Sequence, residues 1–208
     1  GRTETAKTLM GYLKKDSGTV RYKGRELGTD LSKNIQQGIV YLSEDRKDEG
    51  LILMHSVAEN IALPNLDQLC RPFLSKRKQR ETARKYIKDL KIKTFSELSE
   101  AKSLSGGNQQ KVVIAKWLYA DADVYIFDEP TRGIDVGARD EIYNIMYELI
   151  RKKASIIMIS SDLVEVLKMS DRVAVMGEGR VKAILENDGN LTQQDILKVE
   201  LAEGGSAQ

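Results

Sequence analysis

Short runs of consecutive apolar residues alternate along the chain with stretches whose apolar residues have helical spacing. The apolar runs predict strands at residues 39–42, 124–127, 155–160 and 172–176. Helical spacing is clearest in residues 136–152, whose shared apolar face would hold Ile142, Ile145, Met146, Leu149 and Ile150. A shorter helix is expected at residues 162–169. Strands that alternate with helices predict an α/β protein with a parallel sheet, in which the strands are buried on both faces.

Further elements are predicted on both sides of this core. Residues 3–13 have the composition of a helix, which a turn at residues 16–18 would end. Residues 19–23 alternate between polar and apolar, and Gly24 closes them as in a hairpin, so a small antiparallel sheet is expected. Near the C-terminus we expect an edge hairpin strand at residues 181–185, a helix at 191–201 and a tail, 203–208, with no visible means of ordering.

Residues 64–103 differ in composition and predict a helical subdomain. Lysine and arginine are dense from residue 75 to residue 93, and we interpret the basic run SKRKQRETARK as a solvated helix face. A docking surface for a membrane partner is the alternative. A helix is also expected from near Gly106 to about Tyr119. Residues 54–60, just before this subdomain, have a turn-like pattern, so the only histidine, His55, is expected to be structural or exposed.

Length and composition limit the function classes. The 208 residues suffice for one large domain with a real core. A formal net charge of +2, with 31% charged residues of both signs, gives no reason to propose a nucleic-acid partner. No apolar run approaches the roughly 20 residues of a membrane span, so any membrane role is expected to be peripheral. Cys70 is the only cysteine, so no disulfide forms within the chain and a reducing cytoplasm fits.

The segment LSGGNQQK, residues 104–111, has the form of a loop that senses a phosphate. Ser105 can cap a helix that begins near Gly106, and neither Gly106 nor Gly107 has a Cβ that would keep an anion from the backbone. Free N–H groups and the positive end of the helix dipole would then face that anion. An ordinary glycine-rich helix start is the alternative interpretation.

The strand predicted at residues 124–127 ends in two acidic residues, Asp128 and Glu129. Ligand sites of open α/β sheets lie at the carboxyl ends of the strands. A metal-binding carboxylate and a candidate general base at this place, together with a phosphate-sensing loop, indicate ATP hydrolysis. A strand with a solvated acidic end is the alternative, and the spacing to LSGG argues against it.

LSGGNQQK followed by DEPT is the signature of ATP-binding cassette (ABC) proteins, and the match is narrower still. GIVYLSEDRK (residues 38–47), LSGGNQQK and DEPTRGIDVGA (residues 128–138) resemble the second, C-terminal cassette of the duplicated ATPases that energise bacterial ribose, galactose and xylose importers. The resemblance covers essentially the whole chain. Its implied fold is a P-loop NTPase (RecA-like) ABC core with a small antiparallel β subdomain and an α-helical subdomain.

The resemblance also implies a domain organisation. Residues 1–208 would form a single nucleotide-binding domain, in which residues 64–120 are the helical subdomain with the signature and residues 195–208 the end of the last helix and a tail. Gly1, Arg2 and Thr3 match the last three residues of the Walker A loop. The N-terminal strands and most of Walker A are therefore expected to be absent from this sequence.

ATP and Mg²⁺ are the cofactors that the resemblance implies. Thr3 would give its hydroxyl to Mg²⁺, Asp128 would hold the metal mostly through water, and Glu129 would be the general base. Asp135 would link the two nucleotide sites of a dimer. Gly1 and Arg2 would contact the domain's own ATP, whereas the signature residues would contact that of a partner cassette: Ser105, Gly106, Gly107 and Asn108.

Three positions of the nucleotide site depart from the family pattern. Arg2 stands where a phosphate loop usually has lysine, and a planar guanidinium does not replace a compact ammonium neutrally. Ser43, with Glu44 beside it, stands where a glutamine usually reaches the metal and the attacking water. Ser160 and Ser161 stand where a histidine usually contacts the γ-phosphate, which leaves Ser161 as the candidate there. The domain's own site is therefore expected to be partly degenerate.

The leading hypothesis is an ATPase half-site of an importer for simple sugars. Its partners would be an N-terminal cassette of the same polypeptide or a second ABC domain, transmembrane permease subunits and, indirectly, a sugar-binding protein, at the cytoplasmic face of the membrane. Two alternatives remain open. One is a catalytically silent module that uses nucleotide only to dimerise. The other is a non-transport ABC ATPase in DNA repair or translation, which usually has long insertions or strongly basic regions.

Overall fold

A three-stranded parallel sheet forms the centre of the molecule. The computed structural model describes residues 1–70 and 74–202, and its sheet consists of β3 (Ile39–Leu42), β4 (Val124–Asp128) and β5 (Ser155–Ile159), in this order. Ile39 pairs with Val124, and Val124 with Ser155, so the three carboxyl ends lie at one edge. The strands predicted from the apolar runs are thus confirmed to within one residue.

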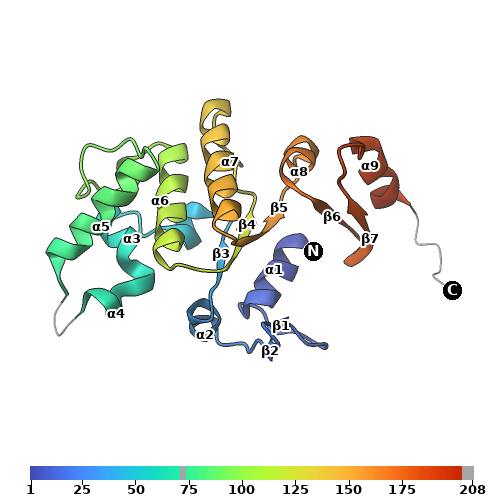
Figure 1. Ribbon diagram of the computed structural model, residues 1–208, viewed down its shortest axis with the longest axis horizontal. Helices are drawn as coiled ribbons and strands as arrows, with labels where there is room; N and C mark the ends of the chain where they lie inside the picture. The colour runs from blue at the N-terminus through green and yellow to red at the C-terminus, as the bar shows by residue number, and fades with distance from the viewer. Residues whose placement is uncertain (71–73, 203–208) are drawn as a thin grey trace.

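Helices cover both faces of this sheet (Figure 1), as the continuous apolar runs require. On one face α6 (Gly106–Tyr119) and α7 (Val136–Arg151) pack on alternate strand residues, among them Val40 and Phe127. On the other face α1 (Arg2–Met10) and α2 (Leu31–Gln36) pack near the intervening residue Tyr41. The predicted helices at 106–119 and 136–152 are confirmed to within one residue.

The first helix is shorter than predicted because α1 ends at Gly11 rather than at residue 13. Gly11 adopts a left-handed conformation, with φ +88°, and its N–H caps the carbonyls of the last turn. A Cβ at this position would lie 3.0 Å from the backbone of Thr29. Glycine therefore both stops the helix and lets the next segment pass close to it.

The small antiparallel sheet is confirmed as a hairpin of β1 (Arg21–Tyr22) and β2 (Arg25–Glu26). Lys23 and Gly24 form its turn, and both have positive φ, +48° and +77°. Two such residues fit the right-handed twist of the flanking strands, which makes this a favoured two-residue hairpin turn. The paired region is only two residues long on each side, shorter than the predicted strand.

The helical layer beside the sheet contains α3 (Val57–Ala62), α4 (Leu66–Leu69), α5 (Lys76–Asp89), α6 and two 3₁₀ turns, Leu63–Asn65 and Ala101–Ser103. The turn-like interpretation of residues 54–60 holds only for the first part of the segment, where the His55 N–H donates to the Ile52 carbonyl at 2.9 Å, because α3 begins at Val57 and packs on α5 and α6. Ser56 and Glu59 form a capping box, the sequence signal that could have revealed this helix. On α5 only Gln79 and Ala83 are buried, so its basic side chains form the solvated face that we expected.

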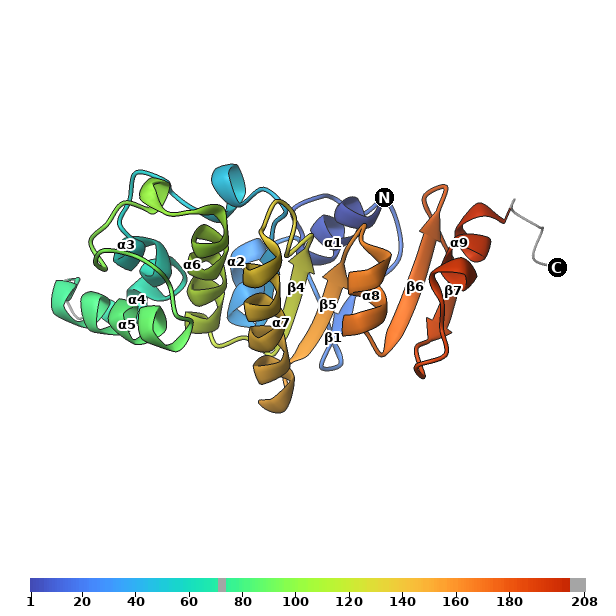
Figure 2. The same cartoon turned by 90° about the horizontal axis from the view of Figure 1, so that it is seen from above.

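Beyond β5 the structure differs from the prediction of one continuous parallel sheet. After α8 (Leu163–Met169), β6 (Arg172–Gly177) pairs antiparallel with β7 (Arg180–Glu186), and α9 (Gln193–Leu201) packs on this hairpin. Figure 2 shows β4, β5 and β6 pointing the same way. In the part of the chain that is described, however, β5 pairs only with β4 and β6 only with β7. Alternation of strands and helices predicts that successive strands run in the same direction, but it does not predict that they are hydrogen-bonded to each other.

The outer strand β5 is also less buried than predicted. Its residues are half-buried or exposed, and Ile157 is 44% exposed.

A membrane-spanning helix is not found among residues 1–70 and 74–202, because none of their helices has the necessary length and apolar character. The predicted tail, residues 203–208, lies outside the described part of the chain.

Candidate nucleotide-binding site

The carboxyl ends of β3, β4 and β5 bring several predicted site residues to one edge of the sheet. The N–H of Glu129 donates to the carbonyl of Ile159, which joins the loops after β4 and β5 at 2.9 Å. The guanidinium Nη1 of Arg2 donates to the carbonyl of Ser160 at 2.8 Å. The start of α1, with Gly1, Arg2 and Thr3, therefore lies at this same edge.

Asp128 is the most deeply buried acid of the site. Only 1% of it is exposed, and its Oδ2 accepts a hydrogen bond from the Tyr41 hydroxyl at 2.7 Å. Its Oδ1 is buried and has no hydrogen-bond partner among the described residues. An unsatisfied buried carboxylate oxygen is costly unless a ligand or water completes it. The Asp128 side chain is thus suited to hold a water or a cation at the strand end.

The donor set fits Mg²⁺ bound mostly by water and phosphate. The described residues contain no cluster of three or more His, Cys, Asp or Glu side chains that would hold a metal alone. Mg²⁺ commonly keeps several waters and takes one or two carboxylates together with phosphate oxygens. Asp128 with its free oxygen fits that pattern, and the half-buried Thr3 is the hydroxyl expected to complete it.

Tyr41 holds Asp128 in place from the neighbouring strand. Burial, and then the hydrogen bond to Asp128, raise the pKa of the Tyr41 hydroxyl well above its usual range, so it acts as a permanent donor at neutral pH. Its ring also packs against that of Tyr12, with centroids 5.6 Å apart. The predicted metal ligand is therefore supported by a residue that the sequence analysis did not single out.

We expect Tyr41→Phe to lower the free energy of unfolding by about 1–3 kcal/mol, because it leaves the second oxygen of a buried carboxylate without a donor. Chemical denaturation at pH 7 measures this. Tyr22→Phe is the matched control, since the Tyr22 hydroxyl also donates to a carboxylate, that of the exposed Asp123, at 2.8 Å. Its loss should stay below about 0.5 kcal/mol. Equal losses in the two variants would contradict the structural role of Tyr41.

Ser43 is held by Glu49, which Lys7 holds in turn, and sequence analysis missed both of these residues. Its Oγ donates to Oε2 of Glu49 at 2.5 Å, and Lys7 Nζ donates to Oε1 of the same carboxylate at 2.7 Å. Lys7 first, and then Ser43, hold the pKa of Glu49 below its usual range. Glu49 reaches this place because residues Arg46–Gly50 form one π-helical turn, capped by Asp45. Nothing in the sequence pattern indicates that turn.

Glu44, the neighbour of Ser43, faces the loop that follows β4. It forms an ion pair with Arg132, and Nη1 of Arg46 donates to the Arg132 carbonyl at 3.1 Å. These contacts fasten the loop after β3 to the loop after β4. The Glu44 carboxylate is therefore already paired within the chain, rather than free beside Ser43.

The two serines after β5 have different environments. Ser160 is buried, and its Oγ donates to Oε2 of Glu165 at 2.5 Å. Glu165, only 2% exposed, also accepts from the Thr131 hydroxyl at 2.8 Å. Ser161 is exposed. The hydroxyl of Ser160 is thus committed to a buried network that sequence analysis missed, and the candidate for a phosphate contact is Ser161.

In the signature segment, Ser105 lies at the N-cap position of α6, but its side chain does not cap the helix. The expectation of a Ser105 cap was therefore wrong. Instead, Ser105 Oγ accepts from Nδ2 of Asn108 at 2.9 Å, and Oδ1 of Asn108 accepts from the Lys93 N–H at 2.7 Å. The Ser105 oxygen therefore bonds the Asn108 side chain and not a backbone N–H of the helix. The first-turn N–H groups of α6 consequently keep their capacity to bind an anion.

The two signature glycines also meet close neighbours within the chain. A Cβ on Gly107 would lie 3.0 Å from the Cβ of Ala138, and one on Gly106 would lie 2.9 Å from Nη2 of Arg46. Asp135, whose Oδ1 caps α7 through the Ala138 N–H, adjoins Gly107. The signature thus packs against the loop after DEPT. This close packing is a second reason for glycine at positions 106 and 107. The first, expected from the sequence, is that a Cβ would keep an anion from the backbone.

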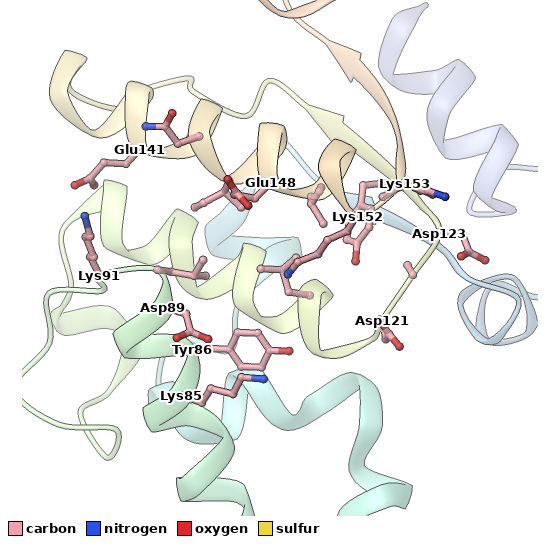
Figure 3. A pocket seen from close by; sticks show the side chains of 18 residues that line it. Lys85, Tyr86, Asp89, Lys91, Asp121, Asp123, Glu141, Glu148, Lys152 and Lys153 are labelled. Atoms are coloured by element: carbon pink, nitrogen blue, oxygen red, sulfur yellow. The ribbon is translucent and has the colours of Figure 1, made fainter.

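Other features of the chain lie away from these loops. His55 is exposed, as expected. A cavity of about 680 Å³ lies between α5, the end of α6 and α7, beside the amino end of β4. Its walls mix apolar side chains with unlike charges, including Lys85, Asp89 and Lys152 (Figure 3). None of the predicted site residues lines it. The candidate site is therefore the loop edge described above rather than this cavity.

Comparison with known proteins identifies the family. The family model described as ABC transporter matches residues 1–132. The chain is 50% identical over 202 residues, 96% of its length, to the ribose import ATP-binding protein of Clostridium perfringens. It is 48% identical over 207 residues, 99% of its length, to a putative ribose/galactose/methyl galactoside import ATP-binding protein of Rhizobium etli. The chain spans 40% and 39% of the lengths of these two relatives.

Solved structures support the fold. A dimeric ATP-binding cassette in a post-hydrolysis state with ADP and phosphate matches with a TM-score of 0.78 at 21% identity, covering 91% of this chain and 82% of that one. A nucleotide-free cassette from an ABC transporter matches with a TM-score of 0.78 at 22% identity, covering 98% and 80%. At this identity the similarity establishes the fold alone.

Proposed function

We infer the function of this chain from the premise that it belongs to the ABC transporter family, whose cassette fold it has. We propose that it binds and hydrolyses ATP as the second cassette of an importer for simple sugars. The family and the fold expected from the three motifs are confirmed by the family match and by the solved cassettes. Ribose or galactose import is what the names of the similar proteins state, and it supports a monosaccharide as cargo.

The observation that carries the ATPase proposal is the carboxyl end of β4. Asp128 has a free buried oxygen there, and Glu129 follows it beside the loop after β5. Asp128 and Thr3 would hold Mg²⁺, which neutralises phosphate charge when it is bound. Glu129 would orient a water and take its proton. Arg2, fixed to the Ser160 carbonyl, would add positive charge at the same edge.

The hydrogen bonds support an asymmetric role for this domain. Glu44 is paired with Arg132 and Ser160 with Glu165, so these groups are occupied within the chain. Slow hydrolysis at the domain's own site fits this arrangement. The signature segment keeps free helix N–H groups near Ser105, which supports its use on the nucleotide of a partner cassette.

The proposed partners follow from this role. They are an N-terminal cassette of the same polypeptide or a second ABC domain, transmembrane permease subunits and, indirectly, a sugar-binding protein, at the cytoplasmic face of the membrane. Closure on ATP would act on the permease through residues 44–60. The loop contacts of Arg46 and Glu44 connect that segment to the nucleotide edge.

We expect Asp128→Asn in the native protein to remove the Mg²⁺-dependent part of ATP binding, because it removes the anionic ligand. Titration with a fluorescent ATP analogue, with Mg²⁺ and with EDTA, measures this. Asp123→Asn is the matched control, since Asp123 lies exposed before the opposite end of β4 and pairs with Lys23. It should change neither curve. No nucleotide binding by the unaltered protein, or the same response in both variants, would refute the proposal.

A further inference from the structure

The Glu49 carboxylate receives hydrogen bonds from two elements, from Lys7 on α1 and from Ser43 after β3. Lys7 lies on α1, one turn after Thr3, so it shares a helix face with the predicted metal ligand. Ser43 follows β3, which carries Tyr41 and through it contacts Asp128. Glu49 thus connects the first helix to the strand edge that holds the acid.

The hydrogen bonds of Ser43 determine where its hydroxyl group points. The Oγ donates its proton to Glu49 and accepts the N–H of Asp45 at 3.2 Å. A hydroxyl has one proton and two lone pairs, so one lone pair remains. Because the proton is fixed on Glu49, Ser43 can offer only an acceptor to its surroundings. An acceptor is what a metal or a metal-bound water requires.

We propose that Glu49 is the positioning residue of the nucleotide site. It fixes the Ser43 hydroxyl as an acceptor for the Mg²⁺-bound water, and so replaces part of what a longer side chain at position 43 would do. This inference rests on the proposed ATPase function. Glu49 itself touches neither nucleotide nor metal, and it acts through Ser43. Residues that orient metal ligands in this way commonly affect metal affinity about 10-fold or more.

The competing interpretation is a plain surface ion pair between Lys7 and Glu49. Their side chains are 24% and 43% exposed, and such pairs contribute little to stability. An ion pair would make Lys7 and Glu49 equally important. The positioning role instead predicts that Glu49 and Ser43 act as one unit and that Lys7 has only a supporting part.

The test compares Glu49→Ala, Glu49→Gln, Ser43→Ala and Lys7→Gln in the native protein. We expect Glu49→Ala to raise the Mg²⁺ concentration for half-maximal ATP binding about 10-fold, with ATP binding in EDTA and the thermal midpoint unchanged. Glu49→Gln should restore most of the Mg²⁺ response, because its amide oxygen still accepts the Ser43 proton. Lys7→Gln should stay within about twofold of the unaltered protein.

The double variant Ser43→Ala/Glu49→Ala decides whether the two residues act together. If Glu49 acts through Ser43, the double variant should match Ser43→Ala alone. Additive losses, or equal effects of Lys7→Gln and Glu49→Ala, would overturn the positioning role. An unaltered protein that binds no ATP would refute the proposed function instead, so the two failures are distinguishable.

Discussion

Gly107→Asp is expected to abolish ATP hydrolysis and transport in the native protein, whereas Arg2→Ala should lower them less. The aspartate would place a negative charge at the N-terminus of α6, where the partner's γ-phosphate is proposed to bind. Removing one donor of preorganised oxyanion stabilisation typically costs about 10²–10³-fold in rate, and a repelling charge costs more. Arg2→Ala should affect only the domain's own site, which we propose is partly degenerate. Steady-state ATPase assays and sugar uptake measure both variants.

Packing at Gly107 requires a control, because any Cβ there would meet the Cβ of Ala138 at 3.0 Å. Gly107→Ala introduces that contact without charge. It should therefore show the steric part of the effect, with the thermal midpoint as a check on folding. Gly107→Asp should lose far more activity than Gly107→Ala. If Gly107→Asp and Arg2→Ala lost equal activity, the proposed asymmetry between the two sites would be wrong.

Sequence pattern predicted the central elements well for a physical reason. The runs that became β3 and β4 are buried on both faces, so they consist of consecutive apolar residues that no exposed segment would tolerate. The amphipathic face of α7 likewise follows from its burial on one side. The position of β6 could not be read in this way. The hairpin strand expected at residues 181–185 is β7, but whether β6 pairs with β5 depends on which strand edges meet, and local pattern does not encode that.

The candidate site was predictable only where residues follow directly from a strand or helix end. Asp128 and Glu129 come from the end of β4, so their place was fixed once that strand was recognised. Glu49 and Glu165 are different, because each also bonds a residue far away in the sequence, Lys7 for Glu49 and Thr131 for Glu165. Ser105 is a case in which a local prediction failed. Its position in the sequence is that of a helix cap, yet its Oγ accepts a hydrogen bond from Asn108 instead of from the backbone of α6.

The hydrogen bonds show how two serines of the candidate site are held within the chain. Ser43 and Ser160 lie at or beside the positions where the resemblance leads us to expect glutamine and histidine, and both donate to carboxylates of the chain itself, the exposed Glu49 and the buried Glu165. No polar group is stranded by these exchanges. Structural demands at the two positions are thus met without nucleotide.

Glu129→Gln is expected to lower hydrolysis at the domain's own site by about 10²-fold or more, because an amide cannot accept the proton of the attacking water. The native protein should then hydrolyse ATP only at the partner's site. ATP bound at this domain should stay intact, which rapid gel filtration with labelled ATP would detect. Glutamine preserves the size of the side chain, and the N–H of residue 129 can still donate to Ile159.

Glu178→Gln is the matched control for this experiment. Glu178 also has a positive φ, +53° against +48° for Glu129, but it lies in the turn between β6 and β7. The same exchange in the same backbone conformation should therefore leave turnover unchanged. If Glu129→Gln also left turnover unchanged while ATP binding persisted, the domain would be a silent module that uses nucleotide to dimerise. A selective loss at Glu129 would instead mean that a site with three altered accessory positions still turns over ATP through its one remaining base.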